Sequence, residues 1–428
     1  MSIFVHWKTQ FAQNRRILTL LFLFKTTYLL AVLGAVSVWP DLDEHEFFNA
    51  FQRWPREGGP IPASHFATWD TAHYLYLSEV GYSSGACACA FYPLWPLLVR
   101  WLSPLLAGKM VLTGLLLSNA CSLSAWMLFH RLVMRRWGET AANWSLVFLI
   151  VFPGSLFFQF SYTESLFFLL LMILWWALDA HQLTCIWLAG CLLPLTRPIG
   201  VFMVLPMAFH ILKKPWRLSH DKVEALLESL TNLFRPQVRA TGKINCEADD
   251  KHWGSGCNLR TFMTAQPLWL LTAPLLGWVV YLALMWKWTG NPFEGFAAQK
   301  YWGVHSITNL CNLPKFVASF FTPTDWHTYG SSVLERTTFV LLLYCIPVIW
   351  RLGKTAIVWT YVLAILPAMS GSFISFTRYM SCAFPVFIAL GVFLSPRERR
   401  WPRYALLAMF TGLHVFLLWR FVNFRWAG

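Results

Sequence analysis

Charged residues are scarce in this chain of 428 residues. Lys, Arg, Asp and Glu together make up 13% of it, against about 25% in soluble domains, and only 20 residues are acidic. Apolar types instead reach 57%, and the chain contains 25 Trp and 36 Phe, as expected where aromatic belts mark membrane interfaces. This composition excludes a soluble globular domain, a disordered protein, and a collagen or coiled-coil chain. We infer an integral membrane protein.

Several patterns that would indicate other functions are also missing. The chain has no glycine-rich nucleotide-binding loop and no clear internal repeat of the kind found in many transporters. Cys246, His252 and Cys257 have neither the spacing nor the fourth ligand of a standard zinc site, so we expect no metal and no other cofactor. The net charge of +14 does not indicate a nucleic-acid partner, because the cations lie between hydrophobic segments.

Hydrophobic segments recur along the chain at lengths suited to a bilayer, which takes about 20 residues of helix. We predict an all-α polytopic membrane protein with about 11 transmembrane helices in contact with membrane lipids. The first span follows Arg15 and Arg16 without a cleavage site and is predicted to be a retained signal-anchor. The predicted spans are 17–39, 111–131, 141–158, 165–180, 184–196, 198–212, 267–288, 333–350, 355–370, 378–395 and 404–422.

The distribution of Lys and Arg orients these spans. With the N-terminus inside, 21 of the 34 cations fall on the cytoplasmic side and about 10 on the other, as the positive-inside rule requires. The C-terminus then lies outside. The connections comprise a long outer loop over 40–110, a basic cytoplasmic loop over 213–266, and an outer loop over 289–332.

The first outer loop carries the strongest catalytic signal. It opens with an acidic run at 41–46, and its apolar spacing predicts two membrane-surface helices, over 71–80 and 91–106. Asp70, preceded by Trp69, comes directly before the first of them. As an N-cap it would accept backbone N–H bonds, but a carboxylate one helical turn from His73 and Tyr74 also suits a general base acting on a hydroxyl at the membrane boundary.

Three further residues fall at span ends on the same predicted face. Glu164 begins a span, where an acid complements the helix dipole whether or not it has a further role. Arg197 lies in a tight turn between two short spans, and Arg378, followed by Tyr379, begins another. Because the positive-inside rule disfavours arginine on this face, each needs a partner, either an anionic lipid phosphate or a loop acid.

These motifs occur in an order that resembles the PIG-V family, which contains GPI mannosyltransferase 2 and its bacterial relatives. The resemblance extends over roughly 65 to 390, and Pro198 departs from it, because eukaryotic members usually have Asn there. The motifs that carry it are Trp69-Asp70 with His73-Tyr74, Gly81-Tyr82, Ala90-Phe91-Tyr92-Pro93-Leu94-Trp95-Pro96, Phe152-Pro153, Tyr162-Thr163-Glu164-Ser165, Thr196-Arg197 and Thr377-Arg378-Tyr379.

The resemblance implies a GT-C glycosyltransferase fold in a single membrane domain over 1–428. Its substrates would be a polyprenyl- or dolichyl-phosphate mannose donor and a glycan or lipid-linked acceptor on the non-cytoplasmic face of a bacterial plasma membrane or the endoplasmic reticulum. Asp70 inherits the role of base in an inverting transfer. The residues predicted to bind substrate or the donor phosphate are Trp69, His73, Tyr74, Glu164, Arg197, Arg378 and Tyr379. Two alternatives stay open: a GT-C enzyme with another sugar or a protein acceptor, and a lipid transporter or flippase.

Overall fold

The computed structural model describes residues 2–38, 54, 61–213, 267–302, 307–328 and 330–428. Within these ranges the chain is helical and contains no β-strand, which confirms the predicted all-α class. The acidic run at 41–46 and the basic loop over 213–266, apart from Lys213, lie outside the described residues.

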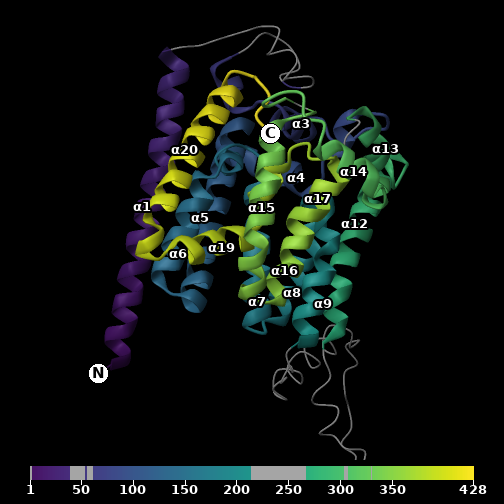
Figure 1. The fold of residues 1–428 in the computed structure, drawn as a ribbon. Coiled ribbons are helices and arrows are strands. Elements are labelled where there is room, and N and C mark those ends of the chain that lie inside the picture. The colour runs from purple at the N-terminus through teal and green to yellow at the C-terminus, as the bar shows by residue number, and fades with distance from the viewer. Residues whose placement is uncertain (1, 39–53, 55–60, 214–266, 303–306, 329) are drawn as a thin grey trace, which may run out of the picture.

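The main helices gather into one bundle, with α3, α4 and α13 near one end and the ends of α7, α8 and α9 near the other (Figure 1). The helices are α1 (Ser2–Val38), α3 (Asp70–Glu79), α4 (Leu94–Leu102), α5 (Met110–Trp137), α6 (Glu139–Val151), α7 (Glu164–Asp179), α8 (Leu183–Thr196), α9 (Val204–Lys213), α12 (Thr272–Thr289), α13 (Glu294–Ala298), α14 (Leu313–Phe320), α15 (Val333–Leu352), α16 (Lys354–Thr360), α17 (Leu366–Gly371), α18 (Phe376–Met380), α19 (Phe384–Leu394) and α20 (Arg400–Val422).

Six helical segments of the described residues are long and apolar enough to cross a membrane, which identifies a multi-pass membrane protein. The other predicted spans coincide with shorter helices, so the count of eleven stays a prediction. The six are Arg15–Val38, Met110–Trp137, Leu268–Thr289, Val333–Leu352, Lys354–Gly371 and Arg397–Val422.

Two predicted spans are interrupted where proline occurs. The span predicted over 141–158 ends as an α-helix at Val151, and a 3₁₀ segment, η4 (Pro153–Phe158), follows. The span predicted over 378–395 consists of the short helix α18 and then α19, which has a proline in its first turn. Proline has no N–H and fixes φ, so it begins a helical segment more readily than it continues one. These breaks put non-helical backbone next to Glu164 and Arg378.

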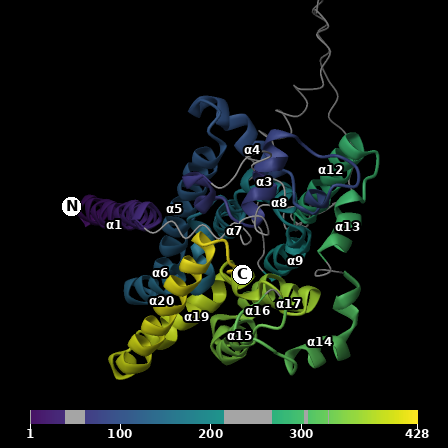
Figure 2. The same ribbon diagram turned by 90° about the horizontal axis from the view of Figure 1, so that it is seen from above.

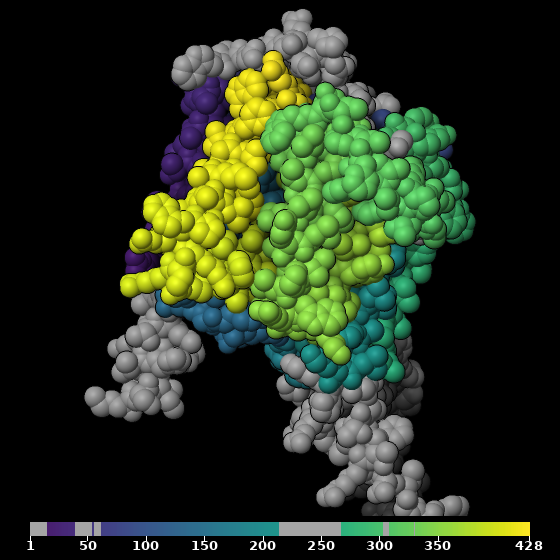
Figure 3. Space-filling view, viewed as in Figure 1, coloured from purple at the N-terminus to yellow at the C-terminus, as the bar shows by residue number. Residues whose placement is uncertain are grey.

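The bundle is tightly packed inside and apolar outside. Helix α6 packs on α19, α5 on α7, and α12 on α8. At the last crossing a Cβ on Gly277 would lie 2.1 Å from the carbonyl oxygen of Cys191, so only glycine permits this approach. Helices α20 and α15 to α17 form one face of the molecule (Figure 3). Large apolar side chains on α15 and α20, such as Tyr344, Trp401 and Trp419, are exposed, as expected for helices in contact with lipid.

Helix α1 lies at one edge of the bundle (Figure 2), yet it carries a buried lysine. Lys25 Nζ lies 4.1 Å from the ring centroid of Trp126 and donates to Phe158 O at 3.4 Å. It also donates to Asn119 Oδ1 at 3.1 Å and to Gln159 Oε1 at 3.0 Å. These contacts attach α1 to the non-helical backbone that follows α6.

Candidate active site

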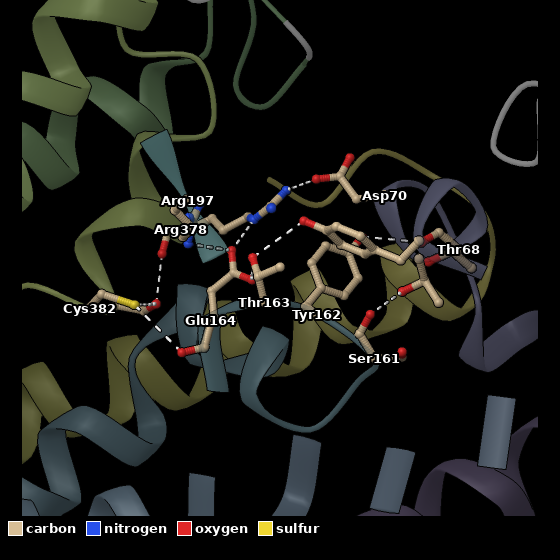
Figure 4. Close-up of polar contacts among 12 residues, drawn as sticks. Thr68, Asp70, Ser161, Tyr162, Thr163, Glu164, Arg197, Arg378 and Cys382 are labelled. Atoms are coloured by element: carbon tan, nitrogen blue, oxygen red, sulfur yellow. Dashed lines mark hydrogen bonds and ion pairs between the residues drawn. The ribbon is translucent and has the colours of Figure 1, made fainter. Parts of the chain in front are cut away.

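Four charged side chains from distant parts of the sequence converge near the α3 end of the bundle (Figure 4). Arg378 forms ion pairs with both Asp70 and Glu164, and Arg197 Nη1 lies 3.0 Å from Glu164 Oε1. Each side chain comes from the end of an element: the first residues of α3 and α7, the turn after α8, and the short helix α18. The structure therefore brings together Asp70 of the predicted outer loop and the three charged residues predicted at span ends.

The two acids of this cluster differ in how deeply they are buried. The Glu164 side chain is 0% exposed, whereas that of Asp70 is 16% exposed and is the most accessible of the four. Two cations and two carboxylates also make the cluster electrically neutral. Both arginines thus have acid partners within the protein: Asp70, the partner of Arg378, belongs to the predicted outer loop, whereas Glu164 begins a helix. Asp70 is the member that a bound molecule can most readily reach.

Aromatic rings cover the faces of the two guanidinium groups. The Cζ atom of Arg378 lies 4.8 Å from the ring centroid of Tyr162, and that of Arg197 lies 4.5 Å from the centroid of Tyr379. Such stacking stabilises a cation while leaving its N–H groups free to point at acids in the ring plane. Tyr379 is therefore placed as a support for Arg197. Tyr162 lay within the sequence motifs but was not predicted as a site residue.

A second buried acid, Glu335 on α15, fixes the backbone that presents Arg378. Its Oε2 accepts a hydrogen bond from the backbone N–H of Thr377 and another, at 2.7 Å, from the hydroxyl of Thr377. On the other side, Gly154 of η4 packs so closely that a Cβ there would lie 2.1 Å from Thr377 O. The prediction missed Glu335. Its one sequence signal, an acid three residues after Ser332, is that of an ordinary helix capping box.

Asp70 is the first residue of α3 and not its N-cap, so the simple capping role is wrong. The N-cap position belongs to Trp69, which has φ 54° and ψ −121°, an unusual conformation for a bulky residue. The Trp69 indole N–H donates to Arg425 O at 3.1 Å, and its ring packs edge-on against that of Trp426 at 5.1 Å. This sharp bend directs the Asp70 carboxylate toward Arg378.

Tyr74 and His73 have different surroundings. The Tyr74 hydroxyl lies 3.3 Å from Thr163 Oγ1. Thr163 directly precedes Glu164 (Figure 4). Burial, with a smaller effect of the Asp70 charge, raises the pKa of Tyr74, so its phenol stays neutral at physiological pH. His73 packs instead in an aromatic cluster, stacked on Phe91 at 5.0 Å and edge-on to Trp302 at 4.9 Å. Its predicted contact with a donor phosphate stays a prediction.

In the part of the chain that the structure describes, no group of three or more His, Cys, Asp or Glu side chains is placed to hold a metal ion. Cys246, His252 and Cys257 lie outside the described residues.

Comparison with known proteins yields a distant structural similarity. No family model matches the chain, and no curated protein matches it. It is similar to the oligosaccharyltransferase of Archaeoglobus fulgidus tethered with an acceptor peptide, at 15% identity and a TM-score of 0.40. It is equally similar, at 14% identity and 0.40, to the archaeal oligosaccharyltransferase AglB from the same organism in complex with an inhibitory peptide and a dolichol-phosphate.

Each alignment covers 95% of this chain and 56% of the other, so the chain spans about half the length of the proteins it matches. Similarity at this level assigns neither a fold family nor an activity. The GT-C architecture and a relation to the PIG-V family therefore stay predictions from the sequence motifs.

Proposed function

We propose that the chain is a GT-C-type membrane glycosyltransferase that transfers mannose from a polyprenyl- or dolichyl-phosphate donor to a lipid-linked or glycan acceptor. The observation that carries this proposal is the position of Asp70. It is the exposed end of an ion-pair network whose other members are almost fully buried. A carboxylate held in place yet open to the surface is what a general base requires.

The transfer proceeds as one inverting displacement. Asp70 accepts the proton of the acceptor hydroxyl while the hydroxyl oxygen forms a bond to the anomeric carbon of mannose. The bond from that carbon to the phosphate oxygen breaks at the same time, and the lipid phosphate leaves with the electron pair. Phosphate is a weak base, so its departure needs no proton from the protein.

Arg378 has two roles in this scheme. Its pairing with Asp70 orients that carboxylate before the reaction. The same guanidinium then stabilises the negative charge that develops on the leaving phosphate. Glu164 and Arg197 act through Arg378, because both are buried behind it and Glu164 pairs with each arginine.

The strained bend at Trp69 supports a catalytic function for Asp70. A bulky residue at positive φ costs about 1–3 kcal/mol and persists where the surrounding structure enforces it, most often at functional sites. The location of the cluster also favours an enzyme over a transporter. Transport sites are expected near the bilayer midplane at a repeat interface, whereas these residues meet at helix ends near α3.

The test is sugar transfer from radiolabelled polyprenyl-phosphate mannose in membranes that contain wild-type protein, Asp70→Asn or Glu79→Gln at matched levels. Asparagine keeps the shape and the hydrogen bond to Arg378 but is not basic. We expect a loss of at least about a hundredfold, the lower limit of what general base catalysis contributes. Glu79 is an exposed acid at the other end of α3 and serves as the matched control.

Full transfer by Asp70→Asn would remove Asp70 from the mechanism. Absence of transfer by a folded wild-type protein would contradict the proposed donor and favour the lipid transporter. In that case lipid movement across vesicles that contain the purified protein is the next measurement.

A further inference from the structure

A second polar site lies at the opposite end of the bundle from Asp70, where α5, α7 and α9 end and α15 turns into α16 (Figure 1). A cavity of about 260 Å³ opens there between the helices. Its polar and aromatic lining includes Arg136, Trp137, Trp175, His210, Lys213 and Trp359. The proposed transfer reaction uses none of these residues.

The cavity has a positively charged rim. Arg136 is 39% exposed, pairs with Asp179, and lies 5.1 Å from the ring centroid of Trp175. His210 Nε2 lies 3.8 Å from Asp179 Oδ1, and Lys213 is exposed at the end of α9. With neutral histidine these side chains sum to one positive charge. The same end of the bundle also carries Arg131, Arg135, Arg351, Lys354, Arg397, Arg399 and Arg400, which raise the positive potential around the cavity.

One residue that lines the cavity also carries a hydrogen-bond donor without a partner among the described residues. The Trp359 side chain is buried, with 2% exposure, and its Nε1 has no hydrogen-bond partner among the described residues. An indole N–H can only donate, and a buried donor without an acceptor costs about 1–3 kcal/mol. The cavity therefore combines cations with a donor that lacks an acceptor, which an anionic oxygen would satisfy.

We propose that this cavity binds the phosphate of an anionic membrane lipid. The phosphate oxygens accept hydrogen bonds from Arg136, Lys213 and the Trp359 indole. Apolar groups deeper in the cavity, such as Phe384 and Ile388, contact the attached lipid. A lipid is the natural source, because basic pockets between helix ends on the cytoplasmic side of membrane proteins collect phosphate headgroups. The proposal is independent of the chemistry at Asp70.

The experiment measures lipid binding to the purified, delipidated full chain in a non-ionic detergent by native mass spectrometry. Phosphatidylglycerol is titrated against wild type and variants, with phosphatidylcholine as the zwitterionic comparison. We expect Arg136→Gln to weaken phosphatidylglycerol binding about tenfold and Lys213→Gln about fivefold, as expected for charged contacts with phosphate. Trp359→Phe removes the N–H together with the pyrrole part of the indole ring and should weaken binding about fivefold.

Arg397→Gln is the matched control, because it removes one exposed cation from the same end without touching the cavity. It should change binding less than twofold. An equal loss in Arg397→Gln and Arg136→Gln, or equal binding of the two lipids, would overturn the proposal in favour of general surface attraction. If Arg136→Gln does not fold, Lys213→Gln and Trp359→Phe decide the question.

Competition with glycerol 3-phosphate and inorganic phosphate distinguishes a site for a lipid phosphate from a site for a soluble phosphate. The lipid proposal predicts that either soluble anion displaces phosphatidylglycerol only at concentrations at least a hundredfold higher. Displacement at equal concentration would overturn the lipid assignment and indicate a site for a soluble phosphate.

Discussion

Asp70 and Glu164 are both carboxylates that contact Arg378, but their surroundings give them different roles. Glu164 lies between two buried arginines and is sealed from solvent. Asp70 contacts one arginine and keeps part of its surface open. Removing one member of a buried ion pair leaves an uncompensated charge, which costs about 3–5 kcal/mol, whereas a partly exposed pair costs much less because water replaces the lost partner.

We therefore expect Glu164→Gln to fail by unfolding and Asp70→Asn to fail in catalysis. Glu164→Gln should lower the free energy of unfolding by about 3–5 kcal/mol, because it leaves Arg197 and Arg378 with Asp70 as their one remaining acid in the cluster. The measurement is the thermal transition of detergent-purified protein followed by size-exclusion chromatography. Asp70→Asn should melt within a few degrees of wild type, and Glu79→Gln provides the baseline. A stable Glu164→Gln protein with no transferase activity would instead place Glu164 in the reaction.

Among the elements, the segment that joins α6 to α7 is held at both ends by polar residues of the outer helices. It leaves the α-helical conformation at Pro153–Phe158, a 3₁₀ segment within a membrane protein, so carbonyl groups at its ends need donors from neighbouring helices. Lys25 of α1 donates to Phe158 O at one end. At the other end His414 Nδ1 lies 3.0 Å from Phe152 O, and its Nε2 lies 3.0 Å from the hydroxyl of Tyr28.

These contacts define the tautomer of His414. Because a carbonyl oxygen only accepts, Nδ1 carries the proton and Nε2 accepts from the Tyr28 hydroxyl. Polar residues of the two outer helices α1 and α20 thus hold both ends of the joining segment. That segment in turn packs Gly154 against Thr377, the residue before Arg378. The outer helices therefore help to position Arg378 through η4.

Gly154→Ala tests this arrangement. The added Cβ would lie 2.1 Å from Thr377 O and 3.1 Å from Arg378 Cα, both of them backbone atoms that cannot rotate away. We expect a loss of about 1–3 kcal/mol from overpacking, together with reduced sugar transfer as Arg378 moves relative to Asp70. Thermal melting and the transfer assay are measured on the same preparation. Gly412→Ala on α20 is the control, because its Cβ meets nothing within 4 Å. Equal behaviour of the two variants would show that η4 does not support the site.

For the whole molecule, the sequence allowed prediction of those features that depend on residues close together along the chain. The all-α class, the helix at 70–79 and the placement of Asp70, Glu164, Arg197 and Arg378 at element ends all followed from periodicity and charge. The partners of these residues did not. Glu335 lies 42 residues from Thr377, and Trp69 lies 356 residues from Arg425. Such pairings depend on how helices pack, and no spacing along the chain encodes them.

Orientation in the membrane is the whole-molecule prediction that most affects function, because it decides which side presents Asp70. The termini lie at opposite ends of the bundle (Figure 1), in keeping with an odd number of spans. Cys311 is free, exposed and part of the predicted outer loop. We therefore expect a membrane-impermeant maleimide to label Cys311 from the non-cytoplasmic side of sealed, oriented vesicles.

The matched probe is Arg397→Cys in a background with Cys246, Cys257 and Cys311 changed to Ser. Arg397 is exposed at the other end of the bundle, so its cysteine should react only after the vesicles are permeabilised. The Ser background alone measures labelling of the remaining, mostly buried thiols. The opposite pattern would put Asp70 on the cytoplasmic side. A cytoplasmic Asp70 would face nucleotide-sugar pools, which would remove the topological reason for a lipid-linked donor even if Asp70 proved to be the base.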